Sequence, residues 1–414
     1  MRQLKRKNST IVQLNRYEPF HNYRKTPVMT EFTQRLETVV KGLYDDLQSI
    51  NPRNLNISEY NQRYLQSKLK TLETSLAVYG DIVGSILCQS RKPLKDFVFI
   101  EYGGGTGFLS LISKKMGVGT VVYNDIYDIS CKDAREIART LGCEAEYYVP
   151  GDIDSLAEFS RKYRIKGDGI ASYDVIEHIY DIDDFCRKLH LILNEGAIMM
   201  HACGGSMFFY PAVKSMIKKQ IEFETRDREN EWGHKKRDSL LSYLNERRKI
   251  IKEYCPSLNE SEIERMAAST RGLIRGDIMK CVDRYLVSKE FPKTIEHPTN
   301  TCDPYTGNWQ EHIMNPYYLQ ESLSFNGFEA KVLPRFWGNR RSSLENTVSG
   351  IINRIIRVSN THVGLHICST MAIYATYNGK FSNEAHRQHL YKFRPSPIWY
   401  VMVVIWDVFS RLRH

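Results

Sequence analysis

Strand-like and helix-like segments alternate from residue 97 to about residue 203, and this alternation constrains the fold more than any other feature of the chain. Apolar runs of strand length occur at 97–101, 120–124, 145–149, 169–174 and 197–202, with a helical pattern after each of the first four. Segments in this order form βαβ units around a parallel sheet. The sequence therefore predicts an α/β core with five parallel strands.

Two more strands are expected at 328–333 and 369–377, after a helix at 315–324 that ends before Asn326-Gly327. They would complete a seven-stranded sheet. The full chain of 414 residues exceeds the usual size of one such core. We expect a basic flexible arm at 1–30, a helical lead-in at 31–92, a core at 93–205 and 295–380, a charged helical insertion at 206–294, and an aromatic, apolar tail at 381–414.

Residues 97–110 read Phe-Val-Phe-Ile-Glu-Tyr-Gly-Gly-Gly-Thr-Gly-Phe-Leu-Ser, which is a buried strand, an acid, a glycine turn and the start of a helix. Glycine at 103, 105 and 107 would let a ligand approach the backbone, because a Cβ would occupy that space. Glu101 would repel the phosphates of a dinucleotide but can accept hydrogen bonds from an ammonium group. Phe108 also stands where the dinucleotide fingerprint needs a third glycine. A zwitterionic ligand is favoured over NAD, and a tight turn without a ligand is the simplest alternative.

Carboxylates follow the next two strands. Asp125 lies 18 residues after Gly107 and can accept hydrogen bonds from both hydroxyls of a ribose. Asp152 can accept from an adenine amino group while Ile153 packs against the ring. Alone, each acid would be an ordinary helix cap, turn or surface residue. Their position at successive strand ends, where sheets of this kind bind ligands, favours a functional role. After the fourth strand, Tyr173 and Asp174 open a segment that continues to His178.

Taken together, these segments resemble the class I S-adenosylmethionine-dependent methyltransferase family, and in particular the branch whose fourth motif contains a Glu-His pair. The resemblance spans 97–205, with weaker support from 312–376. It implies a Rossmann-like, doubly wound seven-stranded sheet with an antiparallel last strand, and S-adenosylmethionine as cofactor. It also implies a set of cofactor-binding residues: Glu101, Gly103, Gly105, Gly107, Asp125, Asp152, Ile153, Tyr173 and Asp174.

The chain departs from the family pattern at two places. Glu101 replaces a common Asp, which keeps the charge, and Asn194-Glu195-Gly196 replaces a Pro-Gly-Gly turn, which keeps the glycine. Neither change argues against the resemblance.

Methyl transfer from a sulfonium is an in-line displacement, so positioning can supply most of the catalysis. A hydroxyl acceptor must also lose a proton. We expect His178 to be the first candidate for the general base and His312 the second. The alternative for His178 is a structural role, as a helix cap or a partner of a backbone carbonyl. No metal site is expected.

The helical insertion should cover the substrate pocket, which suits a small molecule, a lipid or a saccharide. Ordinary packing is the alternative for each residue that could line the pocket: Tyr210, Trp232, Arg271, Arg275, Trp309 and Tyr317. A net charge of +10 would suit an acidic partner. An RNA methyltransferase is therefore a second hypothesis, although no RNA-binding module is recognisable. A cofactor-binding or scaffolding protein without turnover is a third.

Nine cysteines without a CxxC pair indicate neither a disulfide framework nor a cysteine zinc site. The N-terminus lacks the apolar stretch of a signal peptide, and no run approaches the ~20 apolar residues of a membrane-spanning helix. A cytoplasmic protein is therefore expected. Residues 398–405 are apolar and flanked by Trp399 and Trp406, a composition that suits a membrane interface. Peripheral contact with the inner membrane face is one hypothesis for this tail, and docking on the protein's own core or a second subunit is the other.

Overall fold

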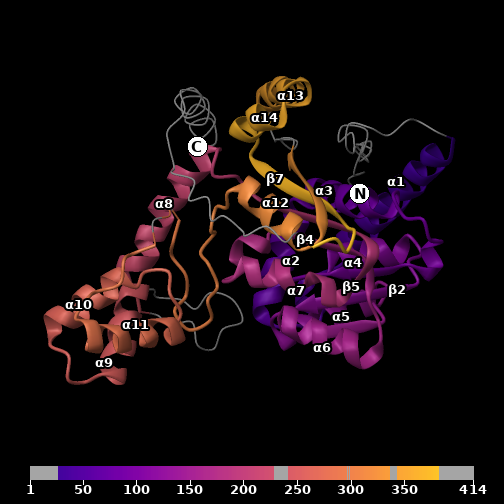
Figure 1. The fold of residues 1–414 in the computed structure, drawn as a ribbon. Helices are drawn as coiled ribbons and strands as arrows, with labels where there is room; N and C mark the ends of the chain where they lie inside the picture. The colour runs from indigo at the N-terminus through magenta and orange to yellow at the C-terminus, as the bar shows by residue number, and fades with distance from the viewer. Residues whose placement is uncertain (1–26, 228–240, 296, 298, 336–342, 382–414) are drawn as a thin grey trace, which may run out of the picture. The chain divides into compact units, whose positions relative to one another are not determined.

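The computed structural model describes residues 27–227, 241–295, 297, 299–335 and 343–381 (Figure 1). Within these residues the chain forms two compact units. The first runs to Tyr173 and includes Lys188–His201 and Ala375–Gly379. The second comprises Asp174–Arg187 and Ala202–Tyr374. No helix in the described part of the chain is both long and apolar enough to cross a membrane.

The first unit begins with three helices, α1 (Pro27–Gln48), α2 (Glu59–Lys70) and α3 (Leu72–Leu87). Apolar residues three and four apart place one face of α1 in the core, as the buried side chains of Leu36, Val40, Leu43 and Leu47 show. Helices α1 to α3 lie in the segment that was expected to be a helical lead-in. The predicted arm is wrong in its last four residues, because α1 already begins at Pro27, and proline is well tolerated in a first helical turn, where its missing N–H is not needed. The rest of the arm lies outside the described residues.

All seven predicted strands are present, with ends shifted by a few residues. They are β1 (Val98–Glu101), β2 (Thr120–Asp125), β3 (Tyr147–Pro150), β4 (Gly167–Tyr173), β5 (Leu193–Gly204), β6 (Phe328–Pro334) and β7 (Thr370–Tyr377). The sheet has the order β3-β2-β1-β4-β5-β7-β6. The β1 strand is parallel to β2 and β4, and β2 is parallel to β3. The expected doubly wound, Rossmann-like mixed sheet with an antiparallel last strand is confirmed.

A helix follows each of the first four strands: α4 (Phe108–Lys115), α5 (Asp128–Thr140), α6 (Ile153–Tyr163) and α7 (Ile182–Ile192). Val121, Val122 and Tyr123 of β2 are all fully buried, as expected for a parallel strand covered on both faces. The β5 strand is longer than predicted. It begins directly after α7, so that residues 193–196, which were expected to close the helix, belong to the strand.

The second unit contains the helices of the predicted insertion, α8 (Tyr210–Thr225), α9 (Tyr243–Tyr254), α10 (Glu260–Ser269) and α11 (Arg275–Ser288). Helices α9, α10 and α11 lie together in Figure 1 and share a small core that includes Ile251, Met266 and Val282. Three later helices are α12 (Pro316–Phe325), α13 (Ser343–Val358) and α14 (Thr361–Ile367). The last two were not predicted from the sequence.

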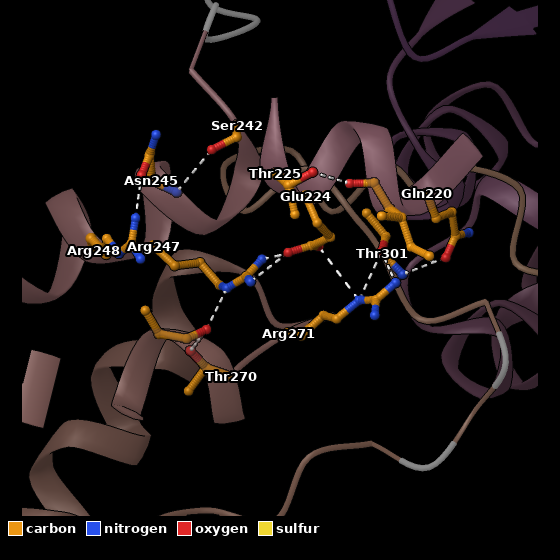
Figure 2. A network of polar contacts seen from close by, with 12 residues as sticks. Gln220, Glu224, Thr225, Ser242, Asn245, Arg247, Arg248, Thr270, Arg271 and Thr301 are labelled. Carbon is orange, nitrogen blue, oxygen red and sulfur yellow. Dashed lines mark hydrogen bonds and ion pairs between the residues drawn. The ribbon is translucent and has the colours of Figure 1, made fainter. Parts of the chain in front are cut away.

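A buried ionic network joins α8 to α9 and to the loop after α10 (Figure 2). The guanidinium of Arg247, only 1% exposed, donates to both carboxylate oxygens of Glu224 at 3.2 and 2.6 Å and to the carbonyl oxygen of Ala267. Arg271 lies 3.6 Å from the same carboxylate and donates to the hydroxyl of Thr301. A single acid therefore neutralises Arg247 and also attracts Arg271.

Candidate functional site

The glycine turn after β1 has the backbone that its sequence implies. Gly103, Gly105 and Gly107 have φ values of +66°, +53° and +78°, in the left-handed region that costs other residues roughly 1–2 kcal/mol each. Three such residues within five positions fold the chain tightly between β1 and α4. The three predicted glycines are therefore required by the backbone, whatever they bind.

The turn also requires glycine at position 104, which was not predicted from the sequence. A Cβ at this position would lie 2.3 Å from Cε2 of Tyr123 and 2.9 Å from Cδ of Glu101. The hydroxyl of Tyr123 also donates to the carbonyl oxygen of Gly105 at 2.6 Å. The turn thus packs directly against β2, and a consecutive Gly-Gly-Gly was the available signal.

Glu101 is 1% exposed and accepts hydrogen bonds from the backbone N–H groups of Leu109 and Ser110, at 3.1 and 2.9 Å. Its carboxylate therefore binds the positive end of α4. Burial raises the pKa of Glu101 to about 7, and the bonds from Ser110 and Leu109 only partly offset that effect. A contact with an ammonium group would use the remaining lone pairs of the carboxylate, directly or through water.

Asp125 closes the turn from the end of β2. Its Oδ2 accepts from Gly105 N–H and its Oδ1 from Tyr127 N–H, both at 3.0 Å. Burial raises the pKa of this carboxyl, and these bonds counteract the shift. The side chain of Ser130 also bonds to this carboxylate. The two oxygens can accept about four hydrogen bonds together, so the carboxylate retains capacity for a ribose hydroxyl.

The end of β3 lies beside the end of β2. Asn124 donates from its amide to the carbonyl oxygens of Val149 and Gly151, at 2.9 and 2.8 Å. Asp152 caps α6 through Oδ1, which accepts from the N–H groups of residues 154 and 155. Its side chain is exposed, whereas Ile153 is buried. This arrangement would allow Asp152 to accept a hydrogen bond from an amino group of a ligand, and Ile153 to pack against a flat ring.

Tyr173, at the end of β4, belongs to an aromatic group that was not foreseen. The Nζ of Lys68 lies 5.2, 5.6 and 5.5 Å from the ring centroids of Tyr64, Tyr79 and Tyr173. The ring of Tyr64 lies 3.4 Å from where a Cβ of Gly105 would be. Helix α2 therefore contributes an aromatic wall to the glycine turn. This contact could not be predicted from the sequence, because only the fold brings α2 and this turn together.

In the second unit, His178 belongs to a short 3₁₀ turn, Ile176–His178. Its Nδ1 lies 2.7 Å from the carbonyl oxygen of Trp309. A carbonyl can only accept, so Nδ1 carries the proton, and Nε2 of the neutral ring is left with its lone pair. This contact matches the structural alternative for His178, and it also orients the ring as a base requires.

His312 is in different surroundings. Its Nδ1 lies 2.8 Å from the carbonyl oxygen of Thr299, and its ring packs between His297 and Trp309, with centroids 3.9 and 4.5 Å away. Burial lowers the pKa of His312 to about 4. A base this weak is poorly matched to proton abstraction at neutral pH. Of the two predicted bases, the geometry favours His178.

Asp174 begins the second unit and accepts a left-handed backbone, with φ of +61°. Of the suggested pocket residues, Trp309 is buried and donates from Nε1 to the carbonyl oxygen of Tyr180, and Arg271 belongs to the ionic network. These contacts match the alternative of ordinary packing. Trp232 lies outside the described residues.

No group of three or more His, Cys, Asp or Glu side chains among the described residues has the arrangement of a metal site.

No family model matches the chain. A relative from Arabidopsis thaliana, the mitochondrial ubiquinone biosynthesis O-methyltransferase, is 31% identical over 137 residues, which cover 31% of this chain and 41% of the relative. The chain thus matches about two fifths of that protein's length.

Two solved structures are similar to the chain over much of its length. The plantazolicin methyltransferase BpumL, in complex with a pentazolic desmethylPZN analog and SAH, is 11% identical, with 84% of this chain and 99% of that chain covered at a TM-score of 0.35. A methyltransferase from Listeria monocytogenes, described as putatively dependent on S-adenosylmethionine, is 12% identical, with 69% and 92% covered at a TM-score of 0.32.

The strand order, the glycine turn closed by Asp125, and the acids at successive strand ends all agree with the resemblance seen in the sequence. The similarity to a curated methyltransferase agrees with it independently. In these features, and in the 137 residues matched to the Arabidopsis relative, the chain is similar to class I S-adenosylmethionine-dependent methyltransferases.

Proposed function

We propose that this chain transfers a methyl group from S-adenosylmethionine to a hydroxyl of a small molecule, a lipid or a saccharide. The observation that carries the cofactor half of the proposal is the bond between Asp125 and Gly105, which places a buried carboxylate beside a glycine-rich turn. When bound, the cofactor would supply an electrophilic methyl group on a sulfonium.

The chain's own residues would hold the cofactor in three places. Asp125 would accept from the ribose hydroxyls, Asp152 from the adenine amino group, and Ile153 would pack against the ring. Gly103 to Gly107 would let the ligand lie against the backbone. Glu101 would accept a hydrogen bond from the ammonium group of the cofactor. Its carboxylate also accepts from the first backbone N–H groups of α4 and so fixes the start of that helix.

The hydroxyl half of the proposal rests on His178. Its Nδ1 is committed to the carbonyl of Trp309, so Nε2 is the atom that would take the acceptor's proton. The Arabidopsis relative is named as an O-methyltransferase, which agrees with attack by oxygen. The helices α8 to α11 would form part of the acceptor pocket, as a helical lid.

The first test is calorimetric titration of the full-length protein with S-adenosylmethionine, S-adenosylhomocysteine and NAD, alongside Asp125→Ala. We expect both sulfur compounds to bind the wild type, and the affinity of the variant to fall by about 100-fold, since two charge-assisted hydrogen bonds are lost. No binding of either compound, or a preference for NAD, would overturn the proposal.

We also propose that residues 381–414, nearly all of which lie outside the described part of the chain, contact membranes peripherally. The support is the aromatic, apolar run at 398–405 with basic residues behind it. Co-sedimentation with anionic liposomes that is lost on truncation at residue 394 is the expected result. Binding to RNA that weakens with salt, with no binding to liposomes, would favour a nucleic-acid acceptor instead.

A further inference from the structure

Three carboxylates of the second unit point to one place beside Gly204, at the end of β5. An atom in the Cβ position of Gly204 would lie 3.6 Å from Oδ1 of Asp174, 3.8 Å from Oε1 of Glu177 and 3.9 Å from Oε2 of Glu311. We call Asp174, Glu177 and Glu311 the acid cluster. Asp174 is exposed and Glu311 is partly exposed, so the cluster is open to solvent on one side.

Glu177 forms the buried end of the acid cluster, with 2% of its surface exposed. Its Oε1 accepts from Gly204 N–H at 2.9 Å, whereas its Oε2 is buried and has no hydrogen-bond partner. A buried carboxylate oxygen without a donor costs free energy that a folded protein normally avoids. Oε2 therefore has room for a hydrogen bond from a donor that the described residues do not supply.

The charge balance around the cluster points to the same conclusion. Burial raises the pKa of Glu177 well above its usual range, and the negative charges of Asp174 and Glu311 raise it further. Burial also raises the pKa of Glu311, against the opposing effects of His178 and Lys219. The carboxylates thus destabilise one another when charged, and a cation placed among them would relieve both the repulsion and the unmet hydrogen bond.

We infer that the acid cluster binds a protonated amine of the methyl acceptor, so that the chain selects cationic acceptors over neutral and anionic ones. An ammonium group has three N–H donors and no acceptor, which matches three carboxylate oxygens that face a common space. Glu311 lies close enough to His178 for their charges to interact, so an amine held here would be near the proposed base. This inference rests on the proposed function and narrows its acceptor.

The acid cluster also lies at the edge of the sheet where a binding site for the methyl acceptor is expected. Asp174 directly follows β4 and Gly204 ends β5, and these two strands are neighbours in the sheet order. Ligands of open α/β sheets bind at the carboxyl ends of the strands. A purely structural acid cluster would instead be expected to have its buried oxygens paired within the protein.

The test uses the full-length protein and three primary amines, tyramine, glucosamine and spermidine, each compared with its N-acetyl form by calorimetry, with and without S-adenosylhomocysteine. At least one amine should bind tenfold or more tightly than its acetylated form. Glu177→Gln should reduce that affinity at least tenfold and leave the affinity for S-adenosylhomocysteine unchanged. Its melting temperature should stay the same or rise, because a buried charge is removed while the Oε1 acceptor is kept.

Asp174→Asn provides a second variant, since asparagine tolerates the left-handed backbone, and Asp283→Asn on α11 is the control that should change nothing. Equal binding of amines and N-acetyl forms, or no amine binding by protein that binds S-adenosylhomocysteine, would overturn the inference. Tight binding of Mg²⁺ with no amine binding would overturn it in favour of a metal. Amine binding without binding of S-adenosylhomocysteine would leave the inferred cation site standing and remove the proposed function.

Discussion

The ring of Tyr123 lies so close to Gly104 that a β-carbon at position 104 would come within 2.3 Å of Cε2. Tyr123 is fully buried and its hydroxyl is bonded to the carbonyl of Gly105, so the ring cannot rotate out of the way without losing that bond. The shape of the glycine turn and the packing of β2 are consequently a single structural unit.

Gly104→Ala should therefore displace the turn that we propose holds the cofactor. We expect at least a tenfold loss of affinity for S-adenosylhomocysteine and a lower melting temperature, because the clash involves a rigid buried ring and not the end of a flexible chain. Calorimetry and thermal unfolding would measure the two effects. Gly142→Ala is a partial control, since its Cβ would meet nothing within 4 Å and only its φ of +62° would be strained. Unchanged cofactor affinity in Gly104→Ala would contradict the described packing.

Glu101 makes a prediction about pH. Its pKa is about 7 in the folded protein, against an ordinary value of 4.5, so between pH 4.5 and 7 the folded state binds a proton that the unfolded state does not. The contribution of this group to stability is therefore full at low pH and decreases as pH rises towards 7, by on the order of 3 kcal/mol.

Denaturant unfolding of the wild type and of Glu101→Gln at pH 5 and pH 8 would measure this effect. The variant should be destabilised at pH 5, because its amide cannot accept from both Leu109 and Ser110. The difference between the two proteins should shrink at pH 8. A difference that grows with pH would show that the carboxylate is favoured by the turn and that burial does not dominate.

The two histidines should respond differently to substitution. His178→Gln is expected to lower the turnover rate by about 10²–10⁴-fold while leaving cofactor affinity intact, since a positioned base contributes that much. His312→Gln should mainly lower the melting temperature, because its half-buried ring packs against His297 and Trp309. Initial rates of S-adenosylhomocysteine release, together with melting curves, would separate the roles. Normal turnover in His178→Gln would remove that residue from the mechanism.

Glu224 should be the most sensitive acid of the helical insertion. Glu224→Gln would leave the buried guanidinium of Arg247 without its charge partner, at a cost of about 3–5 kcal/mol in the free energy of unfolding. Glu264→Gln is the matched control, because its partner Arg248 is about one third exposed, and exposed pairs contribute less than about 1 kcal/mol. Equal effects of the two substitutions in denaturant unfolding would contradict the assigned burial.

The sequence predicted the sheet well because its signals are local. A strand such as 120–125 carries a continuous apolar run, and the turn at 103–107 carries its glycines in adjacent positions. The boundaries between elements were predicted less accurately. Residues 193–196 looked like the end of a helix, since Asn and Gly usually follow one, but in the structure they begin β5.

The site was only partly predictable, because much of it depends on contacts between distant segments. The ring of Tyr64 beside the glycine turn, and the Lys68 ammonium over that ring, come from α2, some 40 residues before the turn. Glu311 joins the acid cluster from a loop more than 130 residues after Asp174. Spacing along the chain carries no record of such pairings, so only the fold could show them.

The left-handed backbones of Asp174 and Glu311, with φ of +61° and +59°, have a consequence for how this protein can diverge. Glycine or asparagine occupies such a conformation at lower cost than a charged residue does. A single substitution at either position would therefore neutralise part of the acid cluster and relax the chain at the same moment. Changing the preferred acceptor requires no rebuilding of the scaffold, and it is the retention of both acids that requires continued selection.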